Sequence, residues 1–581
     1  MKTKASLWAV ALLVFGAALF FVLSAKPAAA ATTWYVDANV PASGAGTEAS
    51  PFKKVIQAVN AASGGDTIYL KNGTYAPSTN GEAFPISTGK ALTFEGQSQD
   101  GVILNAEVAN PETVSYMFMM NSDSGFTKMT FTGYYAALYL TGENTSVTYC
   151  TFQGYYNGAM RASQAIYSLA SGTYSHNILH DHRGYALMVY GGLYGTRPNF
   201  SATIENNEIK NDHTSPYSKA PIGIYMVGTA TEANQATITD NIISGTDGQQ
   251  LLYVGIFLVE NTVDHPQTNT NFVTERNTIS GHFAGLMNLA TIGRCNFQIS
   301  NNYIMATDSA YRNDDNSIGI FVAEADDPDT SASIYNNLIT TNGYGIYLSI
   351  DDEGSTRYDE ISVTNNTLHD IGANAIAAYT NTYGPGNQTV VNTRNNIIAQ
   401  AKNGLYNGGD DGYVKTFTSE NNAFYDITEA SYTQVMPSEN DRQNDPEFAD
   451  KEHGDYSLNP SSLLIDAGTE TTAPPDDIEG TPRPQGRGID IGAYESTDWS
   501  GMFRIGNGYI ATAPASQGGP QYKFFKYDGA QPYRPINAFN TDWRSEFKVQ
   551  TADINGDGVD EIVALRRRGR GTKIARLQEK R

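Results

Sequence analysis

Two short polar clusters in the middle of the chain hold side chains that can exchange protons with a substrate. They follow Asn177 and Asn207 at matching distances and consist of His180, Asp181, His182 and Arg183, and of Lys210, Asp212 and His213. Aligning the two asparagines pairs His180 with Lys210, His182 with Asp212, and Arg183 with His213. A Lys or Arg can abstract the C5 proton of a uronate, a second cation can neutralise its carboxylate, and Asp and His can exchange protons with the leaving oxygen. The residue types therefore predict a glycan-cleaving site. The sequence Leu-His-Asp at 179–181 recurs at 368–370, so ordinary turn chemistry is the alternative.

Two acidic segments form a second candidate site, which would bind substrate. Their carboxylates are Glu324, Asp326 and Asp327 on one segment and Asp351, Asp352 and Glu353 on the next. Stacked carboxylates either raise each other's pKa or gather Ca²⁺, and a cation there could bridge to an acidic polysaccharide. Solvated acidic loops that keep the protein soluble are the alternative.

A third cluster, near the C-terminus, has the ligand spacing of a calcium loop. The oxygen ligands would come from Asp553, Asn555, Asp557, the Val559 carbonyl and Glu561. A hard Ca²⁺ ion takes such ligands from a tight loop, and Gly558 at the sixth position permits the turn. The alternative is an Asn-Gly-Asp turn that holds no ion, and the role is structural in either case.

The elements that must position these residues come from a repeat. An asparagine is followed two residues later by an aliphatic or aromatic residue at nine places, whose asparagines are Asn177, Asn207, Asn241, Asn277, Asn302, Asn337, Asn366, Asn396 and Asn422. A second short apolar run follows most of them, so each unit holds two or three short strands. Such a unit cannot bury its own apolar face, but stacked coils form parallel sheets around one core. The repeat therefore predicts an all-β right-handed parallel β-helix of roughly eleven or more coils, in which the asparagine amides bond to adjacent coils.

Composition and charge support an exported, all-β protein. The 581 residues carry a net charge of −23 with only 17% charged side chains, and 55 Gly and 36 Tyr suit strands and turns. Both ends are basic, so the middle is still more acidic and would repel nucleic acid.

Residues 1–31 are typical of a secretory signal, and an uncleaved membrane anchor is the alternative. Cys150 and Cys295 would lie several coils apart and are expected to be free thiols.

The N-terminal sequence carries a family resemblance. Residues 34–75, from Trp34-Tyr35-Val36-Asp37 through the expected capping helix at 51–62, resemble the first coil of secreted bacterial pectate-lyase-like β-helix proteins. We expect Ser50 to cap that helix. The resemblance extends to about residue 495, where we expect Asp490 to Glu495 to form the last strand. It implies a β-helix, while the family includes lyases, hydrolases, epimerases and proteins with no known activity.

Residues beyond Trp499 resemble one calcium-binding repeat of the integrin-like FG-GAP propeller class. One repeat is too few for a propeller, and it runs into the basic sequence Arg566-Arg567-Arg568-Gly569-Arg570. A truncated end and a basic attachment tail are both open. We therefore expect a signal at 1–31, a β-helix at 32–495, and a small C-terminal β module at 496–581.

These observations predict a secreted or cell-surface protein that binds extracellular polysaccharide. If it is an enzyme, they favour a lyase that cleaves a uronate-containing glycan. A non-catalytic surface scaffold or adhesin is the alternative. The sequence predicts Ca²⁺ as the cofactor of the C-terminal loop, with a second site on the β-helix, and membrane contact only through an uncleaved signal.

Overall fold

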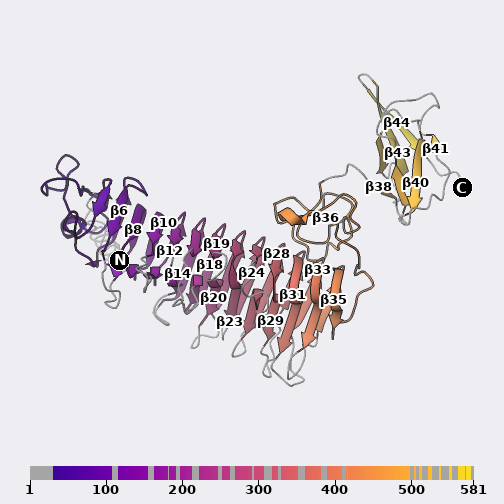
Figure 1. The fold of residues 1–581 in the computed structure, drawn as a ribbon, viewed down its shortest axis with the longest axis horizontal. Helices are drawn as coiled ribbons and strands as arrows, with labels where there is room; N and C mark the ends of the chain where they lie inside the picture. Colours follow the sequence, from indigo (N-terminus) through magenta and orange to yellow (C-terminus); the bar gives the residue numbers. More distant parts are fainter. Residues whose placement is uncertain are drawn as a thin grey trace, which may run out of the picture. The chain divides into compact units, whose positions relative to one another are not determined.

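A computed structural model gives the fold (Figure 1). It describes residues 30–497 except 108–115, 155–161, 181, 192–196, 212–221, 246–251, 262–267, 291–293, 306–316, 325–328, 351–359, 381–388, 409–413 and 415, and beyond 497 only the strands. The described chain is nearly all strand and forms two compact units, Met1–Leu179 and His180–Arg581. Each contains parallel coils, and the predicted right-handed parallel β-helix is confirmed.

The first unit contains one helix, which follows its first strand, and three series of parallel strands. Its elements are β1 (Thr33–Val36), α2 (Val55–Ala61), β2 (Thr67–Leu70), β3 (Gly73–Tyr75), β4 (Ile86–Thr88), β5 (Leu92–Gly96), β6 (Val102–Asn105), β7 (Tyr116–Met120), β8 (Ser124–Thr132), β9 (Ala136–Leu140), β10 (Asn144–Gln153), β11 (Ala162–Ser168) and β12 (Ser171–Ser175). Phenylalanines of successive coils stack inside, with 4.8 Å between the ring centroids of Phe94 and Phe126. This distance equals the spacing of neighbouring strands, so in-register coils place like side chains face to face.

The N-terminus of helix α2 is capped by a distant carboxylate. The helix starts after Lys54, so the prediction that Ser50 caps it is wrong. The Val55 amide donates to Glu82 Oε2 (2.6 Å) and the Ile56 amide to Oε1 (3.3 Å). Glu82 is buried, and burial raises the pKa of its carboxyl. Sequence near the helix cannot reveal this cap, because Glu82 lies on a later turn.

Three series of strands also build the second unit. One consists of β15 (Asn199–Glu205), β18 (Ala233–Thr239), β21 (Asn269–Glu275), β24 (Arg294–Ser300), β27 (Asp329–Tyr335), β30 (Glu360–Thr364), β32 (Val390–Arg394) and β34 (Thr416–Glu420). The next consists of short strands, β16 (Glu208–Asn211), β19 (Ile242–Gly245), β22 (Thr278–Ser280), β25 (Tyr303–Met305) and β28 (Leu338–Thr341), which follow β13 (Ile178–His180). The last consists of β14 (His182–Tyr190), β17 (Ile222–Gly228), β20 (Leu252–Glu260), β23 (His282–Ala290), β26 (Ile318–Glu324) and β29 (Tyr344–Ile350). The long strands β31 (Thr367–Thr380), β33 (Ile397–Gly408) and β35 (Ala423–Thr433) run from the second series into the third.

The asparagines of the repeat form a continuous buried ladder in the second unit. From Asn207 to Asn396, each Nδ2 and each backbone N–H donates to Oδ1 of the next asparagine at 2.9–3.1 Å. The last member, Asn422, donates its backbone N–H to Asp441 Oδ1 (2.9 Å). Each Nδ2 from Asn241 onward also donates to a carbonyl of the preceding coil, for example Asn337 to Ile299 O (2.9 Å). The predicted role of the repeat asparagine is confirmed.

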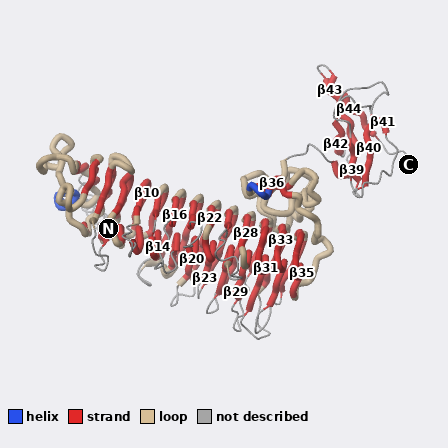
Figure 2. Tube along the Cα trace, viewed as in Figure 1, coloured by secondary structure: helices blue, strands red, loops and turns tan. Residues whose placement is uncertain are grey.

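A segment without regular strands, residues 466–496, packs on the corner beside this ladder, and we call it the strap (Figure 2). The residue before each ladder asparagine has a positive φ, and four such corners are Asn336, Asn365, Asn395 and Asn421. Asparagine tolerates this left-handed conformation. Their Nδ2 groups donate to strap carbonyls, those of Asp476, Asp490, Gly492, Thr469 and Ala467. The strand predicted at Asp490 to Glu495 is therefore wrong. This segment bonds to the corners of the coils, through their side chains and through backbone groups such as Asn395 O, which accepts from the Gly492 N–H (2.7 Å), and it belongs to no strand.

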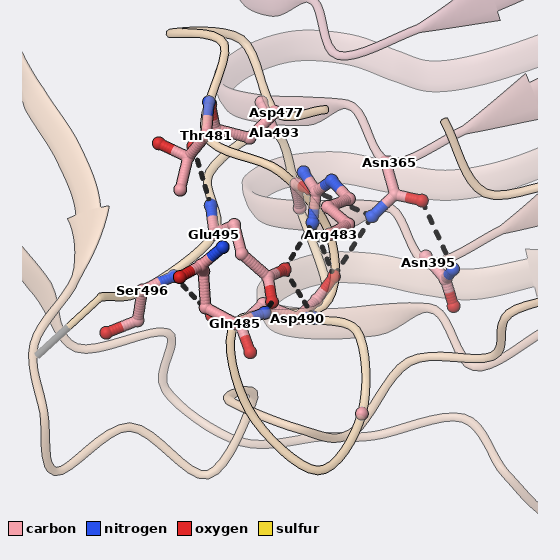
Figure 3. Close-up of polar contacts among 12 residues, drawn as sticks. Asn365, Asn395, Asp477, Thr481, Arg483, Gln485, Asp490, Ala493, Glu495 and Ser496 are labelled. Atoms are coloured by element: carbon pink, nitrogen blue, oxygen red, sulfur yellow. Dashed lines mark hydrogen bonds and ion pairs between the residues drawn. The ribbon is translucent and has the colours of Figure 1, made fainter. Parts of the chain in front are cut away.

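Buried charges hold the strap together (Figure 3). Arg483 Nη1 lies 2.9 Å from Glu495 Oε2, with both side chains at most 1% exposed. Arg483 Nη2 donates to Gly492 O (2.9 Å). Asp490 accepts from the Asp466 and Ser496 amides (both 2.7 Å). Burial, with the charge of Glu495, raises the pKa of Asp490 to about 7. The strap is thus a folded element with its own polar core.

The remaining described elements lie before and after the strap. β36 (Phe448–Asp450), the 3₁₀ turn η2 (Lys451–His453) and β37 (Asp455–Leu458) precede it. The expected C-terminal β module is antiparallel and consists of β38 (Phe503–Ile505), β39 (Tyr509–Thr512), β40 (Gln521–Lys526), β41 (Ile536–Asn537), β42 (Lys548–Ala552), β43 (Glu561–Arg568) and β44 (Gly571–Leu577). Both cysteines are buried free thiols, as predicted. In the part of the chain that is described, no helix has the length and apolar character to cross a bilayer.

Candidate functional site

The first predicted cluster is described only in part. His180 ends β13 and Lys210 lies in β16, and these strands are neighbours in the sheet. Both side chains are half-buried, whereas His182, the first residue of β14, is only 4% exposed. Asp181, Asp212, His213 and the Arg183 side chain lie outside the described residues. The structure therefore puts His180 and Lys210 on adjacent strands.

The second copy of the Leu-His-Asp sequence, at residues 368–370, packs against aromatic rings. His369 is 7% exposed, and its ring lies 5.7 Å from the ring of Phe448 and 5.2 Å from that of Tyr456. Burial lowers the pKa of His369. Asp370 has a positive φ of 56° and marks a corner. In this coil, the Leu-His-Asp sequence serves packing.

The other predicted sites fall mainly outside the described residues. Asp326, Asp327, Asp351, Asp352 and Glu353 are not described, and Glu324 is described only as the last backbone position of β26. Of the calcium loop, only the backbone of Glu561 is described, at the start of β43 and paired with Ala552 of β42. The loop thus connects two antiparallel strands. Among the described side chains, no group of three or more His, Cys, Asp or Glu could hold a metal ion.

A groove that the sequence analysis missed runs over the outer face of the first strand series in the second unit. It consists of two hollows of about 360 and 450 Å³ that share Asn296 and Ser331. The first hollow is further lined by Asn269, Thr270, Asn271, Arg294, Cys295 and Thr330. The second is further lined by Ala332, Ser333, Ile334, Tyr335, Glu360, Ser362, Thr364, Thr472, Pro474 and Pro475. We call the two hollows together the groove.

The floor of the groove is a set of polar rows across β21, β24, β27 and β30. Asn271, Asn296, Ser331 and Glu360 occupy one register position in successive coils. Ser331 Oγ donates to Asn296 Oδ1 (3.0 Å), and Asn296 Nδ2 to Asn271 Oδ1 (3.4 Å). Side chains alternate between the two faces of a strand, so these rows point outward while Phe297 and Ile334 fill the core. The floor therefore offers both donors and acceptors in each coil.

The strap supplies one wall of the groove. Thr472, Pro474 and Pro475 line the second hollow from more than a hundred residues further along the chain. Hydrogen bonds hold this stretch on both sides, from Asn395 Nδ2 to Thr469 O (2.8 Å) and from Asn336 Nδ2 to Asp476 O (2.7 Å). The groove thus combines a hydroxyl- and amide-rich floor with a proline wall. The alternation of polar and apolar side chains along the strands was visible in the sequence. It also occurs at Ser201 and Gln235, which lie outside the groove. The position of the groove therefore follows only from the wall that the strap supplies.

Stacked aromatic side chains occupy the third series of strands and are a weaker candidate for sugar binding. Ring centroids lie 5.3 Å apart for Tyr225 and Phe257, and 4.7 Å apart for Tyr347 and Tyr379. The rings of Tyr347 and Tyr379 are stacked with 16° between their planes, and those of Tyr225 and Phe257 are tilted by 39°, so neighbouring rings shield part of each other's faces. A sugar ring stacks on an aromatic face, so the ladder offers it mainly ring edges.

Two family models match parts of the chain. Residues 39–122 match a family described as a protein of unknown function (DUF1565), and residues 374–471 match one described as disaggregatase related. No curated protein matches the chain.

Several solved structures resemble the chain at low identity. They include pectate lyase Pel9A (15% identity, 80% of this chain and 97% of that chain, TM-score 0.37) and XylC in complex with xylose (11%, 80% and 98%, TM-score 0.38). A mannuronic acid specific polysaccharide family 6 lyase from human gut microbiota is also similar (11%, 73% and 93%, TM-score 0.37). These values give no basis for assigning an activity, so function has to be argued from the residues of this chain.

Proposed function

We propose that this protein is exported and binds an extracellular polysaccharide in the groove. The single observation that carries the proposal is the pairing of the polar floor with the proline wall. A pyranose ring has hydroxyls around its edge and C–H groups on its faces. The floor can bond to the edge through Asn296 and Ser331, while Pro474 and Pro475 pack against a face.

The coil repeat favours a polymer over a single sugar. Neighbouring strands lie about 4.8 Å apart, so equivalent side chains of successive coils form rows of regular spacing. A glycan chain presents its hydroxyls at a similarly regular spacing along its length. Binding of several units then adds weak contacts without any deep cavity.

Blocking the groove tests this proposal. Ser333→Trp puts a large ring on the exposed floor of the second hollow, and Ser201→Trp puts the same ring on the exposed outer face of β15, outside the groove. Affinity electrophoresis and calorimetry against a panel of soluble glycans should show loss of binding in the first variant and retention in the control. Equal binding by both variants would exclude the groove as the site.

Cleavage is a second proposal and concerns a different site. The neighbouring strands β13 and β16 carry His180 and Lys210, and this placement supports β-elimination of a uronate with Lys210 as the proton acceptor. Elimination leaves an unsaturated uronate end that absorbs in the ultraviolet. Lys210→Ala should abolish that signal, whereas Ser244→Ala, one coil later at the same register, should not. If no uronate yields the signal, a binding scaffold or adhesin is the remaining alternative.

Calcium binding by the loop at 553–561 is proposed on its ligand spacing and on its place between the paired strands β42 and β43. Ca²⁺ should stabilise the full-length protein against unfolding. Asp553→Ala and Asp557→Ala should each remove that stabilisation. The acidic segments at 324–327 and 351–353 are proposed as a second calcium site, and their alanine variants would separate the two contributions.

A further inference from the structure

The charges of the groove are few and balanced. Arg294 is the cation and Glu360 the anion among its lining residues, so the formal charge of the lining is zero. Arg394, which donates to Thr472 of the wall (3.5 Å), is already paired with Glu420 at 2.9 Å. The chain as a whole carries −23. Among the described side chains, the groove therefore lacks the excess of positive charge that a polyanion needs.

A uronate polymer fits this lining poorly. Each uronate ring carries one carboxylate, so a chain that spans both hollows would bring several anions against one guanidinium. An anion that leaves water without a partner is strongly disfavoured. The negative charge of the surrounding protein adds repulsion at long range.

Neutral sugar hydroxyls fit the same lining well. A hydroxyl both donates and accepts, as do the side chains of Asn271, Asn296, Ser331 and Tyr335. These groups already form mixed donor and acceptor pairs, including Gln298 Nε2 donating to the Tyr335 hydroxyl (3.0 Å). A sugar hydroxyl can join such a pair in either direction, whereas a carboxylate can only accept.

Resting on the proposed function of the groove, we infer that its ligand is a neutral, hydroxyl-rich glycan segment and not a uronate polymer. Uronate cleavage at His180 and Lys210 would then take place at a separate site. If both proposals hold, the natural ligand is a mixed polysaccharide with neutral and acidic parts.

The experiment compares neutral and acidic probes on the full-length protein. Soluble xylan, galactomannan and a mixed-linkage β-glucan serve as neutral probes, and polygalacturonate and alginate as acidic ones, each with Ca²⁺ or chelator and at low and high NaCl. At least one neutral glycan should bind with an affinity that neither salt nor chelator changes, since screening affects only charged partners. Asn296→Ala should weaken that binding about fivefold by removing one hydrogen-bonding side chain. Ser201→Ala, on the same outer face but outside the groove, should leave it unchanged.

Each outcome separates this inference from the function on which it rests. Groove-dependent binding of a neutral glycan, with none of the uronates displacing it, supports both. If polygalacturonate or alginate binds more tightly than every neutral glycan and Ser333→Trp blocks it, the proposed function stands and the inference fails. If no glycan of either class binds, the proposed function fails and the inference with it.

Discussion

Replacing Asn337 with alanine should lower the free energy of unfolding of the middle coils far more than replacing a surface asparagine does. Asn337 is fully buried, and its Oδ1 accepts from the Asn302 backbone N–H (3.1 Å) and from Asn302 Nδ2 (3.0 Å). Its Nδ2 donates to Ile299 O (2.9 Å), Tyr335 O (3.1 Å) and Asn366 Oδ1 (2.9 Å). Alanine removes all five bonds and leaves their partners in a place that water does not reach.

The size of the effect follows from those partners. A buried polar group that loses its partner costs about 1–3 kcal/mol. The Asn302 N–H has only one hydrogen to donate, so it is orphaned outright, and the Ile299 carbonyl loses a bond as well. Together with the small cavity, the expected loss of unfolding free energy is about 4 kcal/mol. The control is Asn392→Ala on the outer face of β32, where only the bond from Thr418 Oγ1 (2.8 Å) is lost and the cost should stay below about 1 kcal/mol.

Urea unfolding followed by circular dichroism would give the change in stability, and hydrogen exchange read by mass spectrometry would locate it. A coil repeat can unfold in parts, so the local measurement decides. Amides of residues 299–305 and 334–339 should exchange much faster in Asn337→Ala than in the control. If the unfolding free energies of the two variants differ by less than about 0.5 kcal/mol and their amides exchange at the same rates, the ladder does not stabilise the coils through its buried amides.

Three further predictions concern buried ionisable groups. Burial lowers the pKa of His282 to about 4, so the unfolded chain takes up the proton first. About 3 kcal/mol of stability that is present above pH 6.5 is lost as the pH falls toward 4. The urea midpoint of His282→Leu should not fall in this way at acid pH. The raised pKa of Asp490, about 7, has the opposite effect on the pH dependence of stability. The stability that protonated Asp490 contributes is complete below about pH 3.8 and is lost as the pH rises toward 7. In Asp490→Asn, the exchange rates of strap amides should therefore depend less on this loss of stability with pH. Arg483→Ala leaves Glu495 buried without its partner and should lower the folding stability by about 3–5 kcal/mol. The double variant Arg483→Met with Glu495→Met should regain most of that stability. Equal thermal stability of the single and double variants would contradict this view of the ion pair.

The repeat in the sequence is sufficient to predict the structure of one coil. Asn302 and Ile304, Asn337 and Ile339, and their equivalents recur because one amide and one aliphatic side chain per coil satisfy the turn and fill the core. This pattern is local, so it could be read without coordinates, as could the inward and outward alternation along each strand. It also explains why His180 and Lys210 were expected on neighbouring strands.

The position of the strap, and hence of the groove, depends on long-range folding and could not be predicted from the sequence. The corner asparagines hold the strap through its backbone carbonyls, and every residue has a carbonyl, so the strap sequence gives no sign of its partners. The same reason explains why Asp490 to Glu495 was mistaken for a strand. Glu82 was missed as the cap of α2 because its carboxylate comes from a later turn of the chain. Repetition along a chain fixes contacts between adjacent coils, whereas the hollow that Asn296 and Pro475 line together depends on where a distant segment folds back.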